Sequence, residues 1–150
     1  MMERTVAVRP AVPEDDAILA SLAGQLGYAE EPARVRTRLV DLMKRADHVV
    51  YVAEIAGEGA GWVHAFLYQP LHKEKMVEIA GLVVEEGCRR MGIGRRLLAA
   101  VEEWAKAQGC AQVCLGSNIV RKGAHQFYQR AGYELSKTQY IFKKQLQAEV

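Results

Sequence analysis

The sequence predicts an α+β fold built on one mixed sheet, with an antiparallel N-terminal half and a β-α-β-α-β C-terminal half. Residues 48–55, 60–69 and 76–84 are rich in Val, Ile and aromatic side chains and are joined by short links, a pattern typical of an antiparallel meander. Residues 92–108 carry apolar side chains at helical spacing. That helix leads to a further apolar strand at 111–115, and two strands connected by a helix lie parallel.

The N-terminal part predicts one strand and two helices. Residues 6–9 favour a short strand that Pro10 ends. The proline and the acidic residues at 11–16 are typical of the first turn of a helix. A second helix is expected to begin near Pro32, and the loop at 27–31 between the two helices could reach a substrate.

The C-terminal part predicts a helix followed by two short strands. Residues 121–131 favour a short helix, and Gly132 is typical of a residue that ends one. Strands are expected at 133–135 and 139–143, where they would complete the sheet. Because edge strands can pair with a second copy of the chain, a homodimer could form there.

Length and composition limit the classes of function. The chain has 150 residues and a net charge of +2, which favours one domain over residues 1–150 and argues against nucleic acid or an anionic membrane as partner. No apolar run approaches the roughly 20 residues that cross a bilayer, and the N-terminus lacks a signal-peptide pattern. Three cysteines without a Cys-x-x-Cys pair favour a reducing compartment, so we expect a cytoplasmic protein. The spacing of the four histidines predicts no metal site.

The turn between residues 84 and 93 is the strongest functional signal. An apolar strand ends there, and Gly92 and Gly94 open the long helix. Free amides and the positive end of the helix dipole at such a turn favour phosphate. A dinucleotide-binding turn would need a third glycine where Leu97 stands, and a P-loop would need Gly-Lys-Ser/Thr. Four arginines flank the turn and can donate to phosphate oxygens: Arg89, Arg90, Arg95 and Arg96.

The order of these motifs resembles the GNAT superfamily of N-acetyltransferases. The pattern Gln/Arg-x-x-Gly-x-Gly/Ala of that family is matched by residues 89–94, and its Leu-x-Val strand end by residues 82–84. Asn118, the Phe127-Tyr128 pair and the Gly132-Tyr133 pair also fit. The resemblance covers about residues 5 to 145. It implies the GNAT acyl-CoA N-acyltransferase fold, a single N-acetyltransferase domain and acetyl-CoA as the cofactor, with coenzyme A as the co-product. Glu86 departs from the family, where proline is common.

The resemblance also implies which residues hold the cofactor. The backbone of Leu82 and Val84 would pair with the pantetheine arm, with Val83 on the opposite face, and amides between Arg89 and Arg95 would hold the pyrophosphate. Asn118 would touch the cofactor, and Tyr128 would direct its hydroxyl at the sulfur. The residues expected to bind the cofactor are Leu82, Val83, Val84, Arg89, Arg90, Met91, Gly92, Ile93, Gly94, Arg95, Asn118 and Tyr128.

The chemistry of acetyl transfer suggests two catalytic residues. An alkyl ammonium has a pKa near 10.4, so freeing the amine near pH 7.4 costs about 4 kcal/mol and calls for a base. Glu78 is the candidate base, provided that the bulge expected at Gly81 leaves it on the same strand face as Leu82. Tyr128 is the candidate acid for the departing thiolate. The alternatives are an exposed or ion-paired carboxylate and a core aromatic residue. His64 is interpreted as a hydrogen-bonded sheet residue in preference to a substrate contact.

The expected activity is that of an acyltransferase that moves an acetyl group from acetyl-CoA to the primary amine of a small molecule by direct attack. The C-terminal half is similar to that of aminoalkylphosphonate and other small-amine acetyltransferases, but those residues serve the cofactor and scaffold. Two alternatives remain open: acetylation of proteins or peptides, and a non-catalytic module that binds acyl-CoA.

Overall fold

The computed structural model describes residues 5–89, 91–117 and 121–147. It comprises two compact units, Met1–Gly116 and Ser117–Val150. The first unit contains the sheet and three α-helices, and the second contains the fourth α-helix. Each unit is described by itself.

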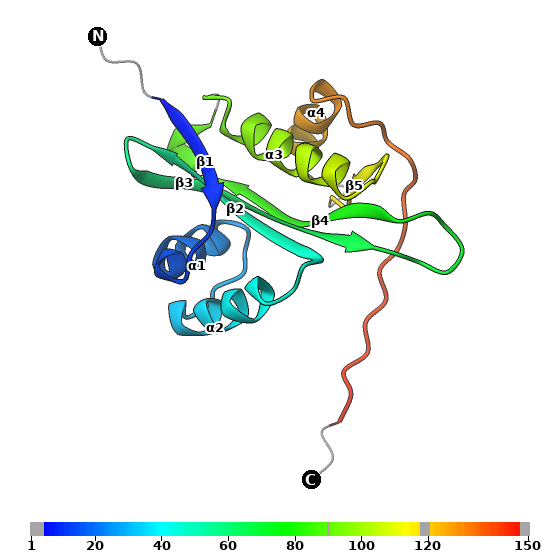
Figure 1. Ribbon diagram of the computed structural model, residues 1–150, viewed down its shortest axis with the longest axis horizontal. Helices are drawn as coiled ribbons and strands as arrows, with labels where there is room; N and C mark the ends of the chain where they lie inside the picture. The colour runs from blue at the N-terminus through cyan, green and yellow to red at the C-terminus, as the bar shows by residue number, and fades with distance from the viewer. Residues whose placement is uncertain (1–4, 90, 118–120, 148–150) are drawn as a thin grey trace. The chain divides into compact units, whose positions relative to one another are not determined.

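The sheet of the first unit has five strands in sequence order (Figure 1). Antiparallel pairing joins the first four strands, and the last two pair in parallel. The predicted meander and the parallel pair across a helix are therefore both confirmed. The strands are β1 (Val6–Pro10), β2 (His48–Ile55), β3 (Glu58–Tyr68), β4 (Met76–Val84) and β5 (Val113–Leu115).

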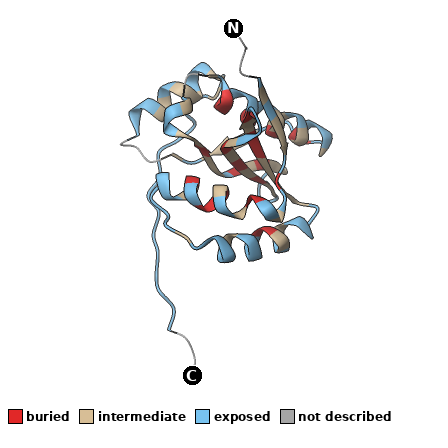
Figure 2. Ribbon diagram, turned by 90° about the vertical axis from the view of Figure 1, so that its left-hand side faces the viewer, coloured by how far each residue is buried: buried red, intermediate tan, exposed pale blue. Residues whose placement is uncertain are grey.

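Helices cover both faces of this sheet. A short 3₁₀ turn, Pro13–Asp15, leads into α1 (Asp16–Gln25), and α2 (Pro32–Met43) follows. Leu19 of α1 and Leu39 of α2 are buried together with Val52 of β2, and Trp62 of β3 packs against them. In Figure 2 the buried residues lie on the strands and on the sheet-facing sides of the helices.

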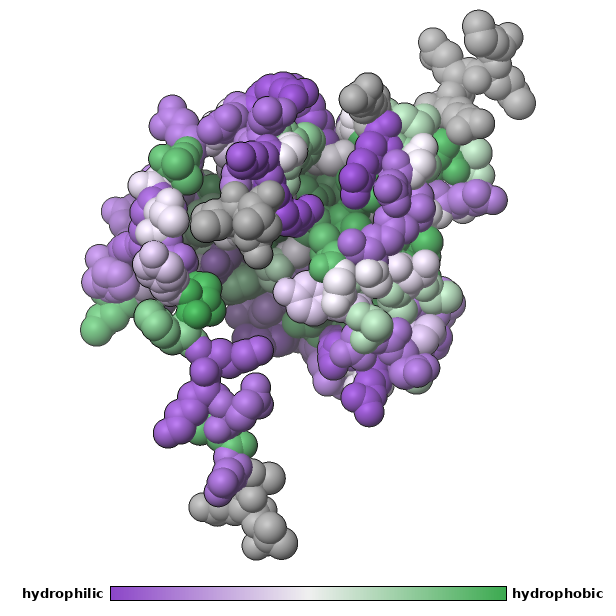
Figure 3. All heavy atoms as spheres, turned by 180° about the vertical axis from the view of Figure 1, so that it is seen from behind, coloured by the Kyte–Doolittle hydropathy of each residue, from purple (hydrophilic) through white to green (hydrophobic). Residues whose placement is uncertain are grey.

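The opposite face packs against α3 (Ile93–Ala107). A Cβ placed on Gly61 of β3 would lie 3.2 Å from side-chain atoms of both Ile93 and Leu97, so from Gly61 onward the odd-numbered residues of β3 point toward this helix. Ile93 and Leu97 are at most 1% exposed, and fully burying such a side chain contributes about 1.5–3 kcal/mol. Hydrophilic residues cover most of the molecular face seen in Figure 3.

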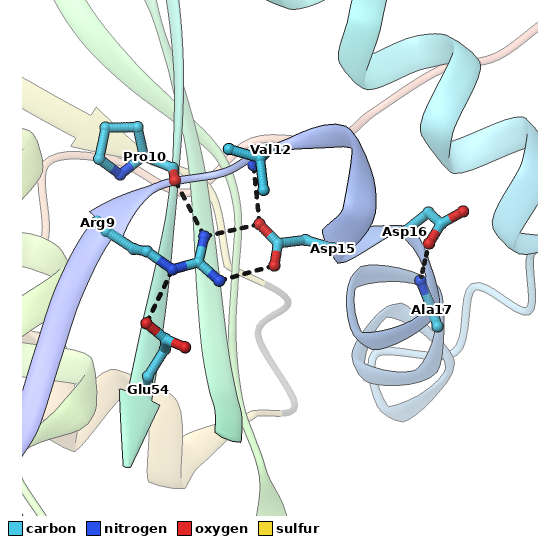
Figure 4. A network of polar contacts seen from close by, with 7 residues as sticks. All are labelled: Arg9, Pro10, Val12, Asp15, Asp16, Ala17 and Glu54. Atoms are coloured by element: carbon cyan, nitrogen blue, oxygen red, sulfur yellow. Dashed lines mark hydrogen bonds and ion pairs between the residues drawn. The ribbon is translucent and has the colours of Figure 1, made fainter. Parts of the chain in front are cut away.

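A partly buried ion pair joins β1 to the turn before α1 and to β2 (Figure 4). The Arg9 guanidinium donates two hydrogen bonds of 2.8 Å to the Asp15 carboxylate and a third, also 2.8 Å, to Glu54. The Val12 amide donates to the same carboxylate at 2.8 Å. Asp15 is only 8% exposed, and the bonds from Arg9 hold its pKa below the ordinary value. The pair therefore links β1, the 3₁₀ turn and β2.

The second unit contains α4 (Lys122–Arg130), followed by irregular chain to residue 147. The strands predicted at 133–135 and 139–143 are wrong. A strand requires a neighbouring strand to receive its backbone hydrogen bonds, and the described part of this unit contains none. The apolar side chains that suggested these strands are exposed: Leu135, Tyr140, Ile141 and Phe142.

Candidate functional site

The C-terminal half of β4 has a partner on one side only among the described strands of the first unit. β3 pairs with it up to Val84, whereas β5 pairs only with Val77 to Ile79. The Glu85 amide donates to Ala60 of β3 at 2.7 Å. Because successive residues of a strand direct their backbone groups to alternate sides, the amides and carbonyls of Leu82 and Val84 point away from β3. They form an edge to which an extended ligand can add.

A bulge separates this half of β4 from the rest of the strand. His64 of β3 lies opposite Gly81, and Ala65 lies opposite Ile79, so Ala80 is the extra residue. A Cβ on Gly81 would lie 3.0 Å from two ring carbons of Trp62, tighter than ordinary contact. The bulge predicted at Gly81 is thus confirmed, and the indole ring explains why glycine suits the position.

The bulge reverses the strand face on which Glu78 lies relative to Leu82. Glu78 is opposite Phe66 and Leu82 is opposite Val63, and β3 residues three positions apart point to opposite faces. Glu78 therefore shares a face with Gly81 and not with Leu82, so the condition set for it in the sequence analysis is not met. Glu78 lies on the face of the sheet that α1 and α2 cover, and its role as a base stays a prediction.

The turn after β4 ends in a residue with a left-handed conformation. A 3₁₀ turn, Glu86–Cys88, precedes Gly92, which has φ 78° and forms the N-cap of α3. The Arg96 amide makes an intrahelical bond of 3.0 Å to the Gly92 carbonyl. The amides of Ile93 and Gly94 stand in the first turn, where the helix supplies no acceptor. This end of α3 has the geometry of an anion site.

The side chains around the turn support this interpretation. Arg89, Arg95 and Arg96 are exposed at the surface and can reach a bound polyanion. The side chain of Glu86 is also exposed, so its carboxylate is not confined beside the amides. Arg90 lies outside the described residues. The described part of the chain has no cluster of His, Cys, Asp and Glu that could hold a metal ion.

A contact that sequence reasoning missed links α1 to this turn. The Gln25 side-chain amide donates to both oxygens of Glu85 at 3.0 Å and accepts from the Glu86 amide at 3.2 Å. Gln25 is the last residue of α1, about sixty residues before the turn, and no local pattern marks it. It positions the turn relative to the helix that leads into the loop at 27–31.

Tyr128 lies on α4 in the second unit. Its ring meets Phe127 and Tyr133 edge to face, with centroids 5.3 and 6.2 Å away. Burial raises the pKa of its hydroxyl, and the charge of Arg121 opposes this rise. The phenol is therefore protonated at neutral pH, as a proton donor must be. Asn118 lies outside the described residues.

A shallow hollow of about 330 Å³ lies at the loop between α1 and α2. Its walls come from Ala29, Glu30, Glu31 and Arg34, and Arg38 holds Glu30 in an ion pair of 3.1 Å. The hollow combines carboxylates with a guanidinium, so its charge alone does not select between cationic and anionic ligands. No helix in the described part of the chain is long and apolar enough to span a membrane.

Comparison with known proteins identifies the family. The family model described as acetyltransferase (GNAT) family matches residues 16–133. The chain belongs to the GNAT family, which confirms the resemblance and the α+β fold class. Aminoalkylphosphonate N-acetyltransferase of Salmonella typhimurium is 40% identical over 81 residues, 53% of each chain. An aminoglycoside N(6')-acetyltransferase type 1 of Stenotrophomonas maltophilia is 26% identical over 152 residues, 98% of each chain.

Several of the similar proteins are matched only in part. The chain spans about half the length of the first curated relatives, including an uncharacterized N-acetyltransferase of Bacillus subtilis that is 37% identical over 75 residues, 49% of this chain. Among solved structures, aminoglycoside N-acetyltransferase AAC(6')-Iy in complex with CoA has a TM-score of 0.85 at 16% identity, over 97% of this chain and 98% of that one. Glucosamine-6-phosphate N-acetyltransferase of Arabidopsis thaliana has a TM-score of 0.81 at 21% identity, over 93% and 98%. The expectations of an acyltransferase and of acetyl-CoA agree with this family.

Proposed function

We propose that this chain is an acetyl-CoA-dependent N-acetyltransferase that acetylates the primary amine of a small molecule by direct attack on the thioester. One observation carries the proposal: an open strand edge at Leu82 and Val84 runs into a helix N-terminus headed by Gly92 in a left-handed conformation. A ligand with an extended arm that ends in a pyrophosphate fits this arrangement, because the strand edge can pair with the arm and the helix N-terminus can bind the pyrophosphate. Acetyl-CoA has this shape and supplies the activated acetyl group.

The residues present fit this cofactor. The backbone of Leu82 and Val84 can pair with the amides of the pantetheine arm as an added strand would. The first-turn amides of Ile93 and Gly94 can donate to the pyrophosphate, and Gly92 has no atom within 4 Å of where a Cβ would stand. Arg89 adds an exposed cation on the approach. The family match to residues 16–133 covers parts of both units, which supports a single domain.

The transfer also needs a base and an acid. We assign Glu78 as the base that frees the amine, acting directly or through water, and Tyr128 as the acid that protonates the thiolate. Tyr128 stays protonated at neutral pH, so its hydroxyl carries the proton that the thiolate must receive. A backbone amide of the bulged strand can polarise the thioester carbonyl as an oxyanion-hole donor does.

A small amine is the proposed acceptor because curated relatives are named for such substrates, among them aminoglycoside and aminoalkylphosphonate acetyltransferases. The loop that carries Glu30 and Glu31 lies at the hollow next to α2, which Arg34 also lines, so the hollow offers groups of both charges to an acceptor. We place acceptor recognition there.

A thiol-release assay with acetyl-CoA and a panel of amines tests the proposal. The panel contains aminoglycosides, aminoalkylphosphonates, simple alkyl amines and lysine peptides. Thiol release with small amines and not with peptides is expected. Release with peptides alone would favour the protein-acetylating alternative. Binding of acetyl-CoA in calorimetry without release by any amine would favour a non-catalytic module.

A further inference from the structure

Two histidines form a hydrogen-bonded pair on the sheet, outside the residues assigned above. Nδ1 of His48, the first residue of β2, lies 2.9 Å from Nε2 of His64 on β3. Their ring centroids are 5.1 Å apart, and His48 stacks on Phe66 at 5.4 Å. Both histidines are half-buried. Since a neutral imidazole has one donor and one acceptor nitrogen, one ring donates and the other accepts.

The pair lies on the same face of the sheet as the candidate base. Trp62 packs against the α1/α2 cluster, and His64 and Phe66 follow it at alternate positions, so all three share that face. Phe66 is the cross-strand partner of both His48 and Glu78. His64 is opposite Gly81, next to the bulge. The histidine pair therefore borders the bulge and lies one strand from the Glu78 carboxylate.

Burial keeps the His64 ring uncharged at neutral pH. Burial, and to a smaller extent the charge of His48, lowers the pKa of His64 from 6.5 to about 4. The acidic groups near the pair are Glu78 on the neighbouring strand and Asp47, which precedes His48 and is held by Arg45 at 3.1 Å. The side chains that α1 and α2 contribute to the cluster on this face, Leu19, Val35 and Leu39, are apolar.

Two imidazole rings joined by a hydrogen bond can pass a proton from one ring to the other. A proton arrives at Nδ1 of His64, the proton on its Nε2 passes to Nδ1 of His48, and the proton on Nε2 of His48 leaves to water. The net change is an ammonium converted to an amine and one proton released to solvent, with both rings left carrying hydrogen on Nδ1. Proton exchange with water must return both rings to the starting tautomer before the next turnover. This route needs His64 in the tautomer with hydrogen on Nε2.

We propose that the His48–His64 pair is the proton relay that carries the acceptor ammonium's proton away from the site at the β4 bulge to solvent. The proposal rests on the proposed function and deepens it. His64 receives the proton through Glu78 or a water molecule, and His48 passes it on. The pair thus acts through other groups and serves to keep the amine neutral during attack.

Kinetics of His64→Gln and His48→Gln test the relay, with His72→Gln as the control because His72 is exposed in the loop before β4. For an alkyl amine of pKa about 10.4, kcat/KM of both relay variants should fall at least ~10-fold at pH 7 and recover toward wild type by pH 9.5. For an acceptor with an α-amino group of pKa about 8, the loss should be smaller. The control should match wild type throughout. Coenzyme A affinity, measured by calorimetry, should be unchanged in all variants and shows that they are folded.

The outcomes separate the relay from the function. Wild-type turnover with an unchanged pH profile in both relay variants would overturn the relay alone, whereas a wild type that acetylates no amine would overturn both. A loss that is equal at every pH and for both amines would assign the pair a structural role. Long-range ¹H–¹⁵N NMR at pH 7 gives a test without activity: hydrogen on Nε2 of His64 is expected, and hydrogen on its Nδ1 would refute the relay.

Discussion

Glycine can be needed at the phosphate turn for its backbone conformation or for lack of space, and substitution of Gly92 separates these two reasons. Its φ of 78° is left-handed, yet no atom lies within 4 Å of a Cβ built there. A side chain would therefore meet no steric obstacle, and the whole cost of Gly92→Ala is conformational. Holding a non-glycine residue in the left-handed conformation lowers the stability of the fold by about 1–2 kcal/mol. Alanine also makes the unfolded chain less flexible than glycine does, which restores about 0.4–1 kcal/mol of stability. We expect a net loss of about 1 kcal/mol in the free energy of unfolding.

Gly87 supplies the matched control within the same turn. A Cβ on Gly87 also meets no atom within 4 Å, but its φ is not in the left-handed region. Gly87→Ala should therefore be neutral or stabilising by up to about 1 kcal/mol. Urea unfolding of the two alanine variants should differ by about 1–2 kcal/mol. Gly92→Asn should fall between them, since Asn tolerates the left-handed region.

Binding of coenzyme A shows whether the conformation of Gly92 also orients the amides of Ile93 and Gly94. The β-branched residue in Gly92→Val should force the turn out of the left-handed region and weaken binding more than ~10-fold, or 1.4 kcal/mol, in calorimetry. Gly87→Ala should bind as wild type. If Gly92→Val keeps both wild-type stability and wild-type affinity, the proposed link between this backbone conformation and the pyrophosphate is refuted.

Three further predictions concern other parts of the chain. His64 takes up a proton near pH 6.5 in the unfolded chain but only near pH 4 in the folded chain, so the free energy of unfolding falls as the pH decreases. Between pH 7.5 and 5, urea unfolding of wild type should show a loss about 2 kcal/mol larger than that of His64→Gln. Equal losses in the two proteins would contradict the burial of a neutral ring. Arg9→Met should lower the free energy of unfolding by about 2–3 kcal/mol because Asp15 remains buried without its partner, and adding Asp15→Asn should restore part of it. Tyr128→Phe should keep coenzyme A affinity and lower kcat, and an unchanged kcat in the thiol-release assay would exclude Tyr128 as the acid.

The parts of the fold that could be predicted are those that local patterns specify. The limits of β2 and β4 follow from runs of Val and Ile bounded by turns, and α3 follows from its apolar stripe and from Gly92. The phosphate turn could be found because its glycines and arginines are adjacent in the chain. The strands expected at 133–135 and 139–143 are absent because apolar and aromatic residues show only that a segment suits a sheet, not that a partner strand is present.

The parts of the site that could not be predicted depend on contacts between distant residues. His48 and His64 meet only because the β2–β3 register sets them diagonally on one face of the sheet. Counting residues outward from the hairpin turn would not give this register, because Ala60 is an extra residue in β3. Gln25, at the end of α1, hydrogen-bonds Glu85, which follows β4 and lies 60 residues later in the sequence. The role assigned to Tyr128 depends on family resemblance, because no local pattern of residues around it marks a proton donor.

The single extra residue at Ala80 explains how one strand serves both substrates of the proposed reaction. Without the bulge, Glu78 and Leu82 would lie on one face, and the carboxylate would point toward α3, where Ile93 and Leu97 are buried. With it, the strand before the bulge directs Glu78 to the α1/α2 face beside the histidines. The strand after it directs the backbone of Leu82 away from β3, to the edge proposed for the pantetheine arm. In the proposed reaction the bulge would therefore place the base and the thioester-binding edge on the same strand without burying a carboxylate in the core.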